Sequence, residues 1–227
     1  ELKTILIITS DKCYKNINSK KKFKEDDKLG GDDPYSASKA ACEILVNSFA
    51  KSFLNNIGVA TARSGNVIGG GDMAKNRLIP DIINSLMNKK NLALRNPNST
   101  RPWQHVFEAL NGYILLAEKL TINKKKFSGA WNFGPIKDNI SVKDIVNKFS
   151  NTWGSKVDFQ FKELKSYKEK KYLSLDSKKA YKDLGWKNKM NINDSILQIV
   201  EWHKYAKRKK DISIFSLTQL KNYLSLK

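Results

Sequence analysis

The stretch TILIITSDK, residues 4–12, decides the fold, because it joins a continuous apolar run to three polar residues. A run of β-branched and apolar residues bounded by a polar cluster is typical of a strand buried on both faces, as in the interior of a parallel sheet. We therefore expect such a strand over residues 4–9, with Ser10, Asp11 and Lys12 at its carboxyl end. Ligands of open α/β sheets bind outside the carboxyl ends of strands, so these three residues are candidates for a substrate site.

A helix and a second strand follow. A charged loop runs to Asp32, helical periodicity covers residues 34–54, and residues 58–63 form a short apolar run. Pro34 suits the first turn of a helix, and Asp32 or Asp33 can cap its N-terminus. Strand, helix and strand in this order predict a right-handed crossover connection in an α/β sheet.

The rest of the chain continues this alternation, with no internal repeat. A glycine-rich loop covers residues 65–76. Helices are predicted over residues 77–87, 107–120, 141–153, 178–184 and 192–205, and strands over residues 91–95, 130–133 and 157–161.

Composition is typical of a soluble globular protein. The 227 residues correspond to about one and a half domains, and 40% of them are hydrophobic and 28% charged, which excludes a disordered or fibrous chain. No apolar run approaches the roughly 18 residues of a membrane span, so we expect no membrane association. The two cysteines lack the spacing of metal ligands, from which we expect a reducing compartment, a cytoplasmic location and no metal site.

The net charge of +20 raises the hypothesis of nucleic-acid binding. Of the 42 basic residues, however, 37 are Lys and five are Arg, whereas specific recognition of bases and phosphates favours the guanidinium group. The basic runs at residues 20–22, 124–126 and 208–210 lie beside predicted helix or strand ends, as solvated loops do. We favour generic surface charge and no nucleic-acid partner, with a basic nucleic-acid-binding module as the alternative.

The segment YSASK, residues 35–39, places a phenol and an ammonium four residues apart, on one face of the predicted helix. A free phenol has a pKa of about 10, so a fixed cation is needed to favour its phenolate form at neutral pH. Tyr-x-x-x-Lys alone is a common pattern, and a solvated Lys39 beside a core Tyr35 is the simpler interpretation. The polar corner of residues 10–12 changes the balance, because hydroxyl, carboxyl and ammonium groups can position a sugar alcohol and move protons.

Seven motifs together resemble a known family. They are TSDKCY (9–14), DPYSASK (33–39), GNVIGGGD (65–72), RLIP (77–80), RNP (95–97), RPWQHV (101–106) and WNFGP (131–135). In this order they resemble the CDP-glucose 4,6-dehydratase family, in the extended short-chain dehydrogenase/reductase superfamily, over about residues 4–205. The resemblance implies an α/β fold: the C-terminal part of a Rossmann-type parallel sheet plus a smaller α+β domain that binds a nucleotide sugar.

Domain boundaries follow from the resemblance. Residues 1–68 are expected to belong to the Rossmann domain and to carry the catalytic residues. Residues 69–205 are expected to form mainly the substrate-binding region, with residues 91–120 returning to the Rossmann sheet. Residues 206–227 are expected to form a basic, helical tail.

The activity implied by the resemblance is the NAD-dependent dehydration of CDP-glucose to CDP-4-dehydro-6-deoxyglucose. Tyr35, assisted by Lys39 and Ser10, would take the proton from the 4-hydroxyl while hydride passes to NAD, so Tyr35 and Lys39 are also the implied cofactor contacts. Asp11 is implied as the acid for the departing 6-hydroxyl. Lys12 stands where other nucleotide-sugar dehydratases carry a glutamate base, and its pKa of about 10.4 would have to fall for it to act as one.

Substrate contacts and a partner are implied as well. Arg101 matches the position that holds the diphosphate, a role suited to guanidinium geometry. Asn66 is implied as a sugar or diphosphate contact, and Arg77, Leu78 and Asn132 as parts of the nucleotide pocket, although loop capping is an open alternative for both asparagines. A homodimer is implied, in which the outer face of the 34–54 helix pairs with another subunit.

The sequence departs from the family at its start and at residues 168–173, where Lys168-Glu169 and two further lysines precede Tyr172-Leu173 and the family commonly shows His-Glu. A glycine pattern also has to be weighed. Residues 69–74 formally fit the Gly-x-Gly-x-x-Gly/Ala pattern, but no acidic residue follows between Asp81 and Glu108, where a ribose-binding acid is expected, so we interpret them as a substrate-side loop. The family opens with a glycine-rich turn over the NAD pyrophosphate, which is missing before residue 4. We therefore expect a C-terminal fragment that is inactive by itself, because the pyrophosphate grip supplies most of the cofactor binding.

Two further functions stay open besides nucleic-acid binding. One is another nucleotide-sugar epimerase or dehydratase, and the other is a non-catalytic protein that only binds nucleotide sugars.

Overall fold

The computed structural model describes residues 2–135, 140–161, 170–208 and 211–226. Its helices are α1 (Pro34–Phe53), α2 (Leu78–Asn88), α3 (Val106–Ile122), α4 (Lys124–Phe127), α5 (Val142–Trp153), α6 (Ile192–Arg208) and α7 (Ser213–Ser225), with a 3-10 turn η1 (Asp11–Cys13) and a π-helical turn η2 (Ala180–Leu184). Its strands are β1 (Thr4–Ile8), β2 (Gly58–Ser64), β3 (Val67–Ile68), β4 (Leu92–Leu94), β5 (Thr100–Arg101), β6 (Gln104–His105), β7 (Gly129–Phe133), β8 (Ile140–Ser141) and β9 (Phe159–Phe161).

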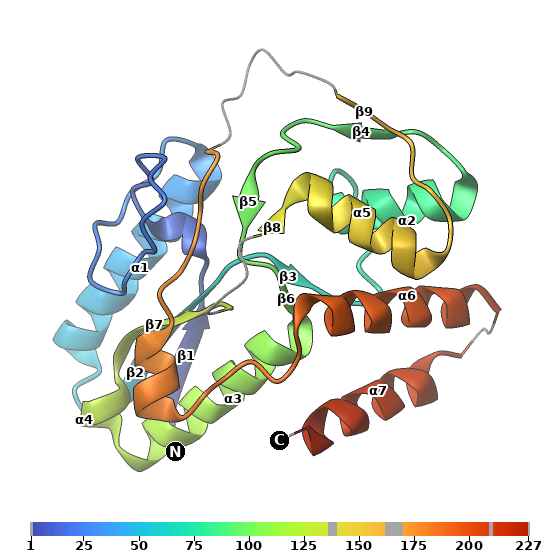
Figure 1. Cartoon of the computed structure of the whole chain (residues 1–227). Coiled ribbons are helices and arrows are strands. Elements are labelled where there is room, and N and C mark those ends of the chain that lie inside the picture. The colour runs from blue at the N-terminus through green and yellow to red at the C-terminus, as the bar shows by residue number, and fades with distance from the viewer. Residues whose placement is uncertain (1, 136–139, 162–169, 209–210, 227) are drawn as a thin grey trace.

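The main sheet is parallel, with strand order β1-β2-β7, and it lies between α1 and α3 (Figure 1). Successive side chains of a strand point to opposite faces. Ala60 and Ala62 of β2 pack with Leu116 and Leu120 of α3. The alternate β2 residues, at positions 61 and 63, hydrogen-bond to α1. The expected strand–helix–strand unit is therefore present, and its second strand is buried along its whole length.

The sequence prediction that the first strand is buried on both faces is wrong for this structure. The residues of β1 are only half-buried, and Ile8 is 46% exposed. The physical reason is the position of β1 at the edge of the sheet: among the described residues, β2 is its sole neighbour. The β-branched run fixes the strand and its direction, whereas burial depends on the neighbouring elements.

A second region packs α2, α5 and α6 around an apolar core that includes Ile82, Phe149 and Ile196. It contains three two-stranded pairs, β3–β6 and β4–β9, which are parallel, and β5–β8, which is antiparallel. Residues 91–120 were expected to return to the main sheet. Within this range, α3 packs against the main sheet, whereas β4 pairs with β9 in the second region (Figure 1).

The glycine-rich loop lies against α6. A Cβ atom on Gly70 would stand 2.4 Å from Cγ of Trp202, and Gly71 has a φ of +81°. These glycines therefore permit the close approach of an indole ring, which gives a packing reason for the glycine cluster. Trp202 in turn donates to Ser216 Oγ at 3.0 Å, which joins α6 to α7. No helix in the described ranges is both long and apolar enough to span a bilayer.

Candidate active site

The turn η1 forms the corner predicted at the end of β1. Ser10 caps it: its Oγ accepts a hydrogen bond from the backbone N–H of Lys12 at 3.2 Å and donates one to Oδ1 of Asp11 at 3.1 Å. A serine in extended conformation is a favoured residue at this position. Ser10 and Asp11 are buried and Lys12 is half-buried.

Asp11 is a buried carboxyl group with one unsatisfied oxygen. Its side chain is 3% exposed, and Oδ2 has no hydrogen-bond partner within the described part of the chain. Burial raises the pKa of Asp11 to about 6, although the hydrogen bond from Ser10 and the charges of Lys12 and Arg101 act in the opposite direction. Near neutral pH this carboxyl group can take up or release a proton, as a general acid must.

The first two turns of α1 carry the phenol and the ammonium. Asp33 caps the helix by accepting from the backbone N–H of Ser36 at 3.0 Å. Lys39 Nζ lies 5.7 Å from the centre of the Tyr35 ring, and Lys12 Nζ lies 5.9 Å from the same point. The Tyr35 side chain is 52% exposed, so a ligand can reach the phenol. The structure thus brings the Nζ atoms of Lys12 and Lys39 together over the Tyr35 ring.

A buried ion pair holds α1 against the sheet. Glu43 lies two turns beyond Tyr35, and its Oε2 is 2.7 Å from Nη2 of Arg63 on β2, with both side chains under 5% exposed. Oε2 also accepts from Thr61 Oγ1 at 2.7 Å, and Oε1 accepts from Thr9 Oγ1. Burial alone would raise the pKa of Glu43, but the hydrogen bond and charge of Arg63 outweigh it and hold that pKa below its usual value.

Sequence reasoning missed this ion pair. The sequence did carry a signal for it: Glu43 lies four residues after Lys39 and eight after Tyr35, on the same face of the predicted helix. A charged residue on the face that meets a sheet is expected to have a partner there.

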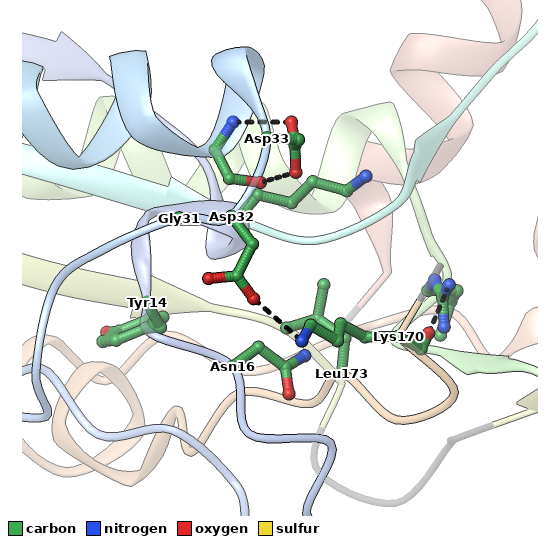
Figure 2. Close-up of a pocket in the computed structure, with 10 residues that line it drawn as sticks. Tyr14, Asn16, Gly31, Asp32, Asp33, Lys170 and Leu173 are labelled. Atoms are coloured by element: carbon green, nitrogen blue, oxygen red, sulfur yellow. Dashed lines mark hydrogen bonds and ion pairs between the residues drawn. The ribbon is translucent and has the colours of Figure 1, made fainter. Parts of the chain in front are cut away.

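A cavity of about 300 Å³ opens beside the corner (Figure 2). Its walls come from four separate parts of the chain, and its lining residues are Lys12, Tyr14, Asn16, Gly31, Asp32, Asp33, Ser36, Arg101, Lys170 and Leu173. Lys12 and Arg101 were predicted site residues, whereas Asp32 and Lys170 were not predicted to take part. The cavity therefore combines three cationic side chains with two carboxylates and with hydroxyl groups, as a site for a polar ligand does.

Arg101 is buried at the wall of this cavity and braces the segment beside it. Its Nη2 donates to the carbonyl of Lys170 at 2.9 Å, and its Nη1 donates to the carbonyl of Lys171 at 3.2 Å. From the other side, Asn18 Oδ1 accepts from the backbone N–H of Lys171 at 2.7 Å, and Asn16 Nδ2 donates to the carbonyl of Tyr172 at 2.8 Å. The guanidinium group thus lies close to Asp11 and also positions residues 170–172.

The remaining predicted substrate contacts do not line the cavity. Asn66 is half-buried between β2 and β3, and its carbonyl accepts from the N–H of Gln104. Arg77 is exposed at the start of α2 and pairs with Asp72 at 3.4 Å, and Leu78 packs at the edge of the second apolar core.

Asn132 is fully buried, and its amide group has partners already. Its Oδ1 accepts from Tyr14 Oη at 2.7 Å, and its Nδ2 donates to the carbonyls of Phe23 at 2.9 Å and Asp176 at 3.3 Å. Tyr14 also accepts from Arg63 at 2.8 Å. Asn132 therefore extends the buried network around Glu43, and it does so from within β7.

A parallel sheet flanked by helices, with a Tyr-x-x-x-Lys pair beside a polar corner at a strand end, defines a Rossmann-type protein of the short-chain dehydrogenase/reductase class. Solved structures share this fold. The UDP-glucuronic acid 4-epimerase of Bacillus cereus, in complex with UDP-glucuronic acid and NAD, superimposes with a TM-score of 0.80 at 20% identity over 91% of this chain and 63% of that chain. The dTDP-glucose 4,6-dehydratase of Bacillus anthracis, in complex with NAD, gives a TM-score of 0.76 at 18% identity over 89% and 62%.

Within that class, the chain belongs to the GDP-mannose 4,6 dehydratase family, whose family model matches residues 2–199. The CDP-glucose 4,6-dehydratase of Salmonella typhimurium is 42% identical over 99% of the chain, and the chain spans 65% of the length of that relative. A trifunctional UDP-glucose 4,6-dehydratase, epimerase and reductase of Arabidopsis thaliana is 28% identical over 75% of the chain and 24% of its own length.

Proposed function

We propose that the chain carries the catalytic corner and the nucleotide-sugar site of an NAD-dependent CDP-glucose 4,6-dehydratase. The observation that carries the proposal is the 42% identity to the Salmonella typhimurium enzyme across 99% of the chain. The geometry supports it, because Tyr35, Lys39 and Lys12 gather around one exposed ring beside the buried Asp11.

In this proposal Tyr35 takes the proton from the 4-hydroxyl of the sugar. The ammonium group of Lys39 is placed to stabilise the negative charge on the phenol oxygen, and such pre-positioned charges are a large source of catalysis. Ser10 orients the same hydroxyl group. Because its Oγ already bonds to Asp11 and to the backbone of η1, Ser10 is held in a fixed position for this task.

The second step removes water across C5 and C6. Asp11 gives its proton to the departing 6-hydroxyl, for which a carboxyl group with a pKa of about 6 is suited. Lys12 is the proposed base at C5, a role that requires its neutral amine form, and its Nζ lies 5.9 Å from the centre of the Tyr35 ring. The 4-keto group formed in the first step makes the C5 proton acidic, so the base has to remove only an activated proton.

NAD is the proposed cofactor, and it would supply the hydride acceptor for C4 and the hydride donor for C6. Tyr35 and Lys39 fit its nicotinamide end, because an exposed phenol and an ammonium one helical turn apart can both reach ribose hydroxyl groups. The glycine cluster at Gly70 does not fit its pyrophosphate, since Trp202 packs against it.

Arg101 is the proposed diphosphate contact, and Asn66, Arg77 and Leu78 are proposed further contacts outside the cavity. Asn132 is proposed to act only through the network around Tyr14. The expected homodimer and the cytoplasmic location also stay predictions. An exposed apolar face on α1, with Leu45 and Phe49 each more than half exposed, supports the dimer.

Binding and product analysis test this function. Calorimetry with the chain is expected to give tighter binding of CDP-glucose than of UDP-, GDP- or dTDP-glucose. For turnover, the chain is joined behind the cofactor-binding segment of the Salmonella relative and given NAD and CDP-glucose, and mass spectrometry is expected to find a product that has lost one water. Tyr35→Phe is expected to keep binding and lose turnover. An epimerised sugar of unchanged mass would instead favour an epimerase, and binding without turnover in the joined protein would favour a non-catalytic protein.

A further inference from the structure

An ion pair crosses the solvent side of the 300 Å³ cavity. Nζ of Lys170 lies 2.9 Å from Oδ2 of Asp32, and Figure 2 shows the two side chains extending toward one another from opposite walls. The Lys170 side chain is 40% exposed and that of Asp32 is 70% exposed. Ion pairs this exposed are weak, because water screens them and two flexible side chains must be held in place. The pair can therefore be exchanged for another partner.

Lys170 is held at its backbone, and its side chain is 40% exposed. Its carbonyl accepts from Arg101, and the next residue, Lys171, is held by Thr100 and Asn18 through backbone hydrogen bonds of 3.0 and 2.7 Å. An ammonium group on an anchored backbone loses little further freedom when it binds a ligand.

The two carboxylates on the cavity wall, Asp32 and Asp33, have different partners. Asp33 caps α1, with its oxygens accepting from Ser36 N–H at 3.0 Å and from Ser36 Oγ at 2.6 Å. Asp32 pairs with Lys170, whose hydrogen bond and charge lower the pKa of Asp32. Rotation of the Asp33 side chain would break the cap of α1, whereas the Asp32 side chain can rotate toward solvent without breaking a cap.

We propose that Lys170 is a ligand for a phosphate oxygen of the nucleotide diphosphate, and that Asp32 is an internal competitor that occupies Lys170 until this anion displaces it. The inference rests on the proposed function, since it takes the diphosphate of that nucleotide sugar as the anion. Arg101 and Lys170 line the same cavity, and a diphosphate placed between them is paired from two sides. Asp32 then supplies the negative charge beside Lys170 that the diphosphate replaces.

A purely structural role for the pair makes the opposite prediction for one variant. If the ion pair only locks residues 170–172 to the start of α1, removal of either charge loosens the cavity and weakens binding. If Asp32 competes with the ligand, its removal strengthens binding.

The experiment is calorimetry of CDP-glucose binding to the full chain and to Lys170→Met, Asp32→Asn and the double variant. Lys171→Met and Asp26→Asn are matched charge controls: the Lys171 side chain lies over the Tyr172 ring, and Asp26 is exposed on the preceding loop. We expect Lys170→Met to raise Kd about tenfold, as for loss of one charge-assisted contact. We expect Asp32→Asn to lower Kd about threefold. In the double variant, which lacks the Lys170 ammonium group, we expect Asp32→Asn to have a smaller effect. The two control variants are expected to change Kd by less than about twofold.

Competition identifies the anion, because inorganic pyrophosphate is expected to displace CDP-glucose from the unaltered chain and less effectively from Lys170→Met, whereas glucose is not. Thermal melting of each variant shows that it is folded. Weaker binding by a folded Asp32→Asn protein, or unchanged binding by both single variants, would overturn the inference and leave the proposed function standing. Absence of CDP-glucose binding by the unaltered chain would instead reject the proposed function, and the inference with it.

Discussion

Replacement of Asp11 by Asn is expected to make the protein more stable at neutral pH. The pKa of Asp11 is raised from 3.8 to about 6 by burial. The folded state therefore binds this proton more tightly than the unfolded state, and the stabilising contribution is complete below about pH 3.8 and lost as the pH rises through about 6. A shift of about two pKa units, at about 1.4 kcal/mol per unit, corresponds to roughly 3 kcal/mol. Ionisation of the buried carboxyl group therefore lowers the free energy of unfolding by this amount.

The asparagine side chain has nearly the same shape and no charge to bury. Its Oδ1 can still accept from Ser10, whereas its amide N–H groups would lack the partner that Oδ2 also lacks, at a cost of about 1 kcal/mol. The net expectation at about pH 7.5 is a gain of about 2 kcal/mol, or roughly 4–8 °C in Tm for a chain of this size. At about pH 4 the gain should vanish, since Asp11 is then neutral in the folded state.

Urea unfolding of Asp11→Asn and of the unaltered chain at both pH values measures this difference. The comparison between the two proteins at each pH removes the contributions of all other titrating groups. Asp26→Asn on the surface is the control and should change stability by less than about 0.5 kcal/mol. An equal difference at both pH values, or a variant less stable at about pH 7.5, would refute the reasoning that Asp11 is a buried, destabilising charge.

Three further outcomes are expected from the packing. Glu43→Gln should lower the free energy of unfolding by about 3–5 kcal/mol in urea titrations, because Arg63 stays charged and buried, and a loss of less than about 1 kcal/mol would contradict the role of this pair. Gly70→Ala should cost about 1–3 kcal/mol, since its Cβ would stand 2.4 Å from Trp202, and an unchanged Tm would show that the loop yields freely. Phe49→Glu should convert a dimer to a monomer in sedimentation experiments, and an unaltered chain that is already monomeric would reject the α1 interface.

The local part of the site was predictable from the sequence. Tyr35 and Lys39 share a helix face because residues four apart always do, and a cap at Asp32 or Asp33 was read from the residue types that precede a helix. The position of the corner followed from the rule that strand ends collect ligands in α/β sheets. Each of these inferences depends on fewer than about ten neighbouring residues, so tertiary packing could not overrule it.

The parts that failed or were missed depend on residues distant in the sequence. The burial of β1 was overestimated because a β-branched run does not show whether a second strand lies beside it. The pairing of Asp32 with Lys170 joins two loops whose sequences carry no signal of each other. The contact between Gly70 and Trp202 likewise joins residues far apart in the sequence, so the need for a glycine at position 70 becomes clear only from the fold.

The alternation along β2 explains how one strand can set the geometry of the whole site. Thr61 and Arg63 point to α1 and hold Glu43, which lies on the helix that carries the reactive phenol, while the intervening alanines point to α3. Through Thr9, the same glutamate is tied to the end of β1, directly before the corner of residues 10–12. A shift of β2 by one residue would exchange its two faces and bury alanines where the carboxylate needs partners. The distance between the phenol and the corner is therefore determined by the register of a strand that contributes no reacting group itself.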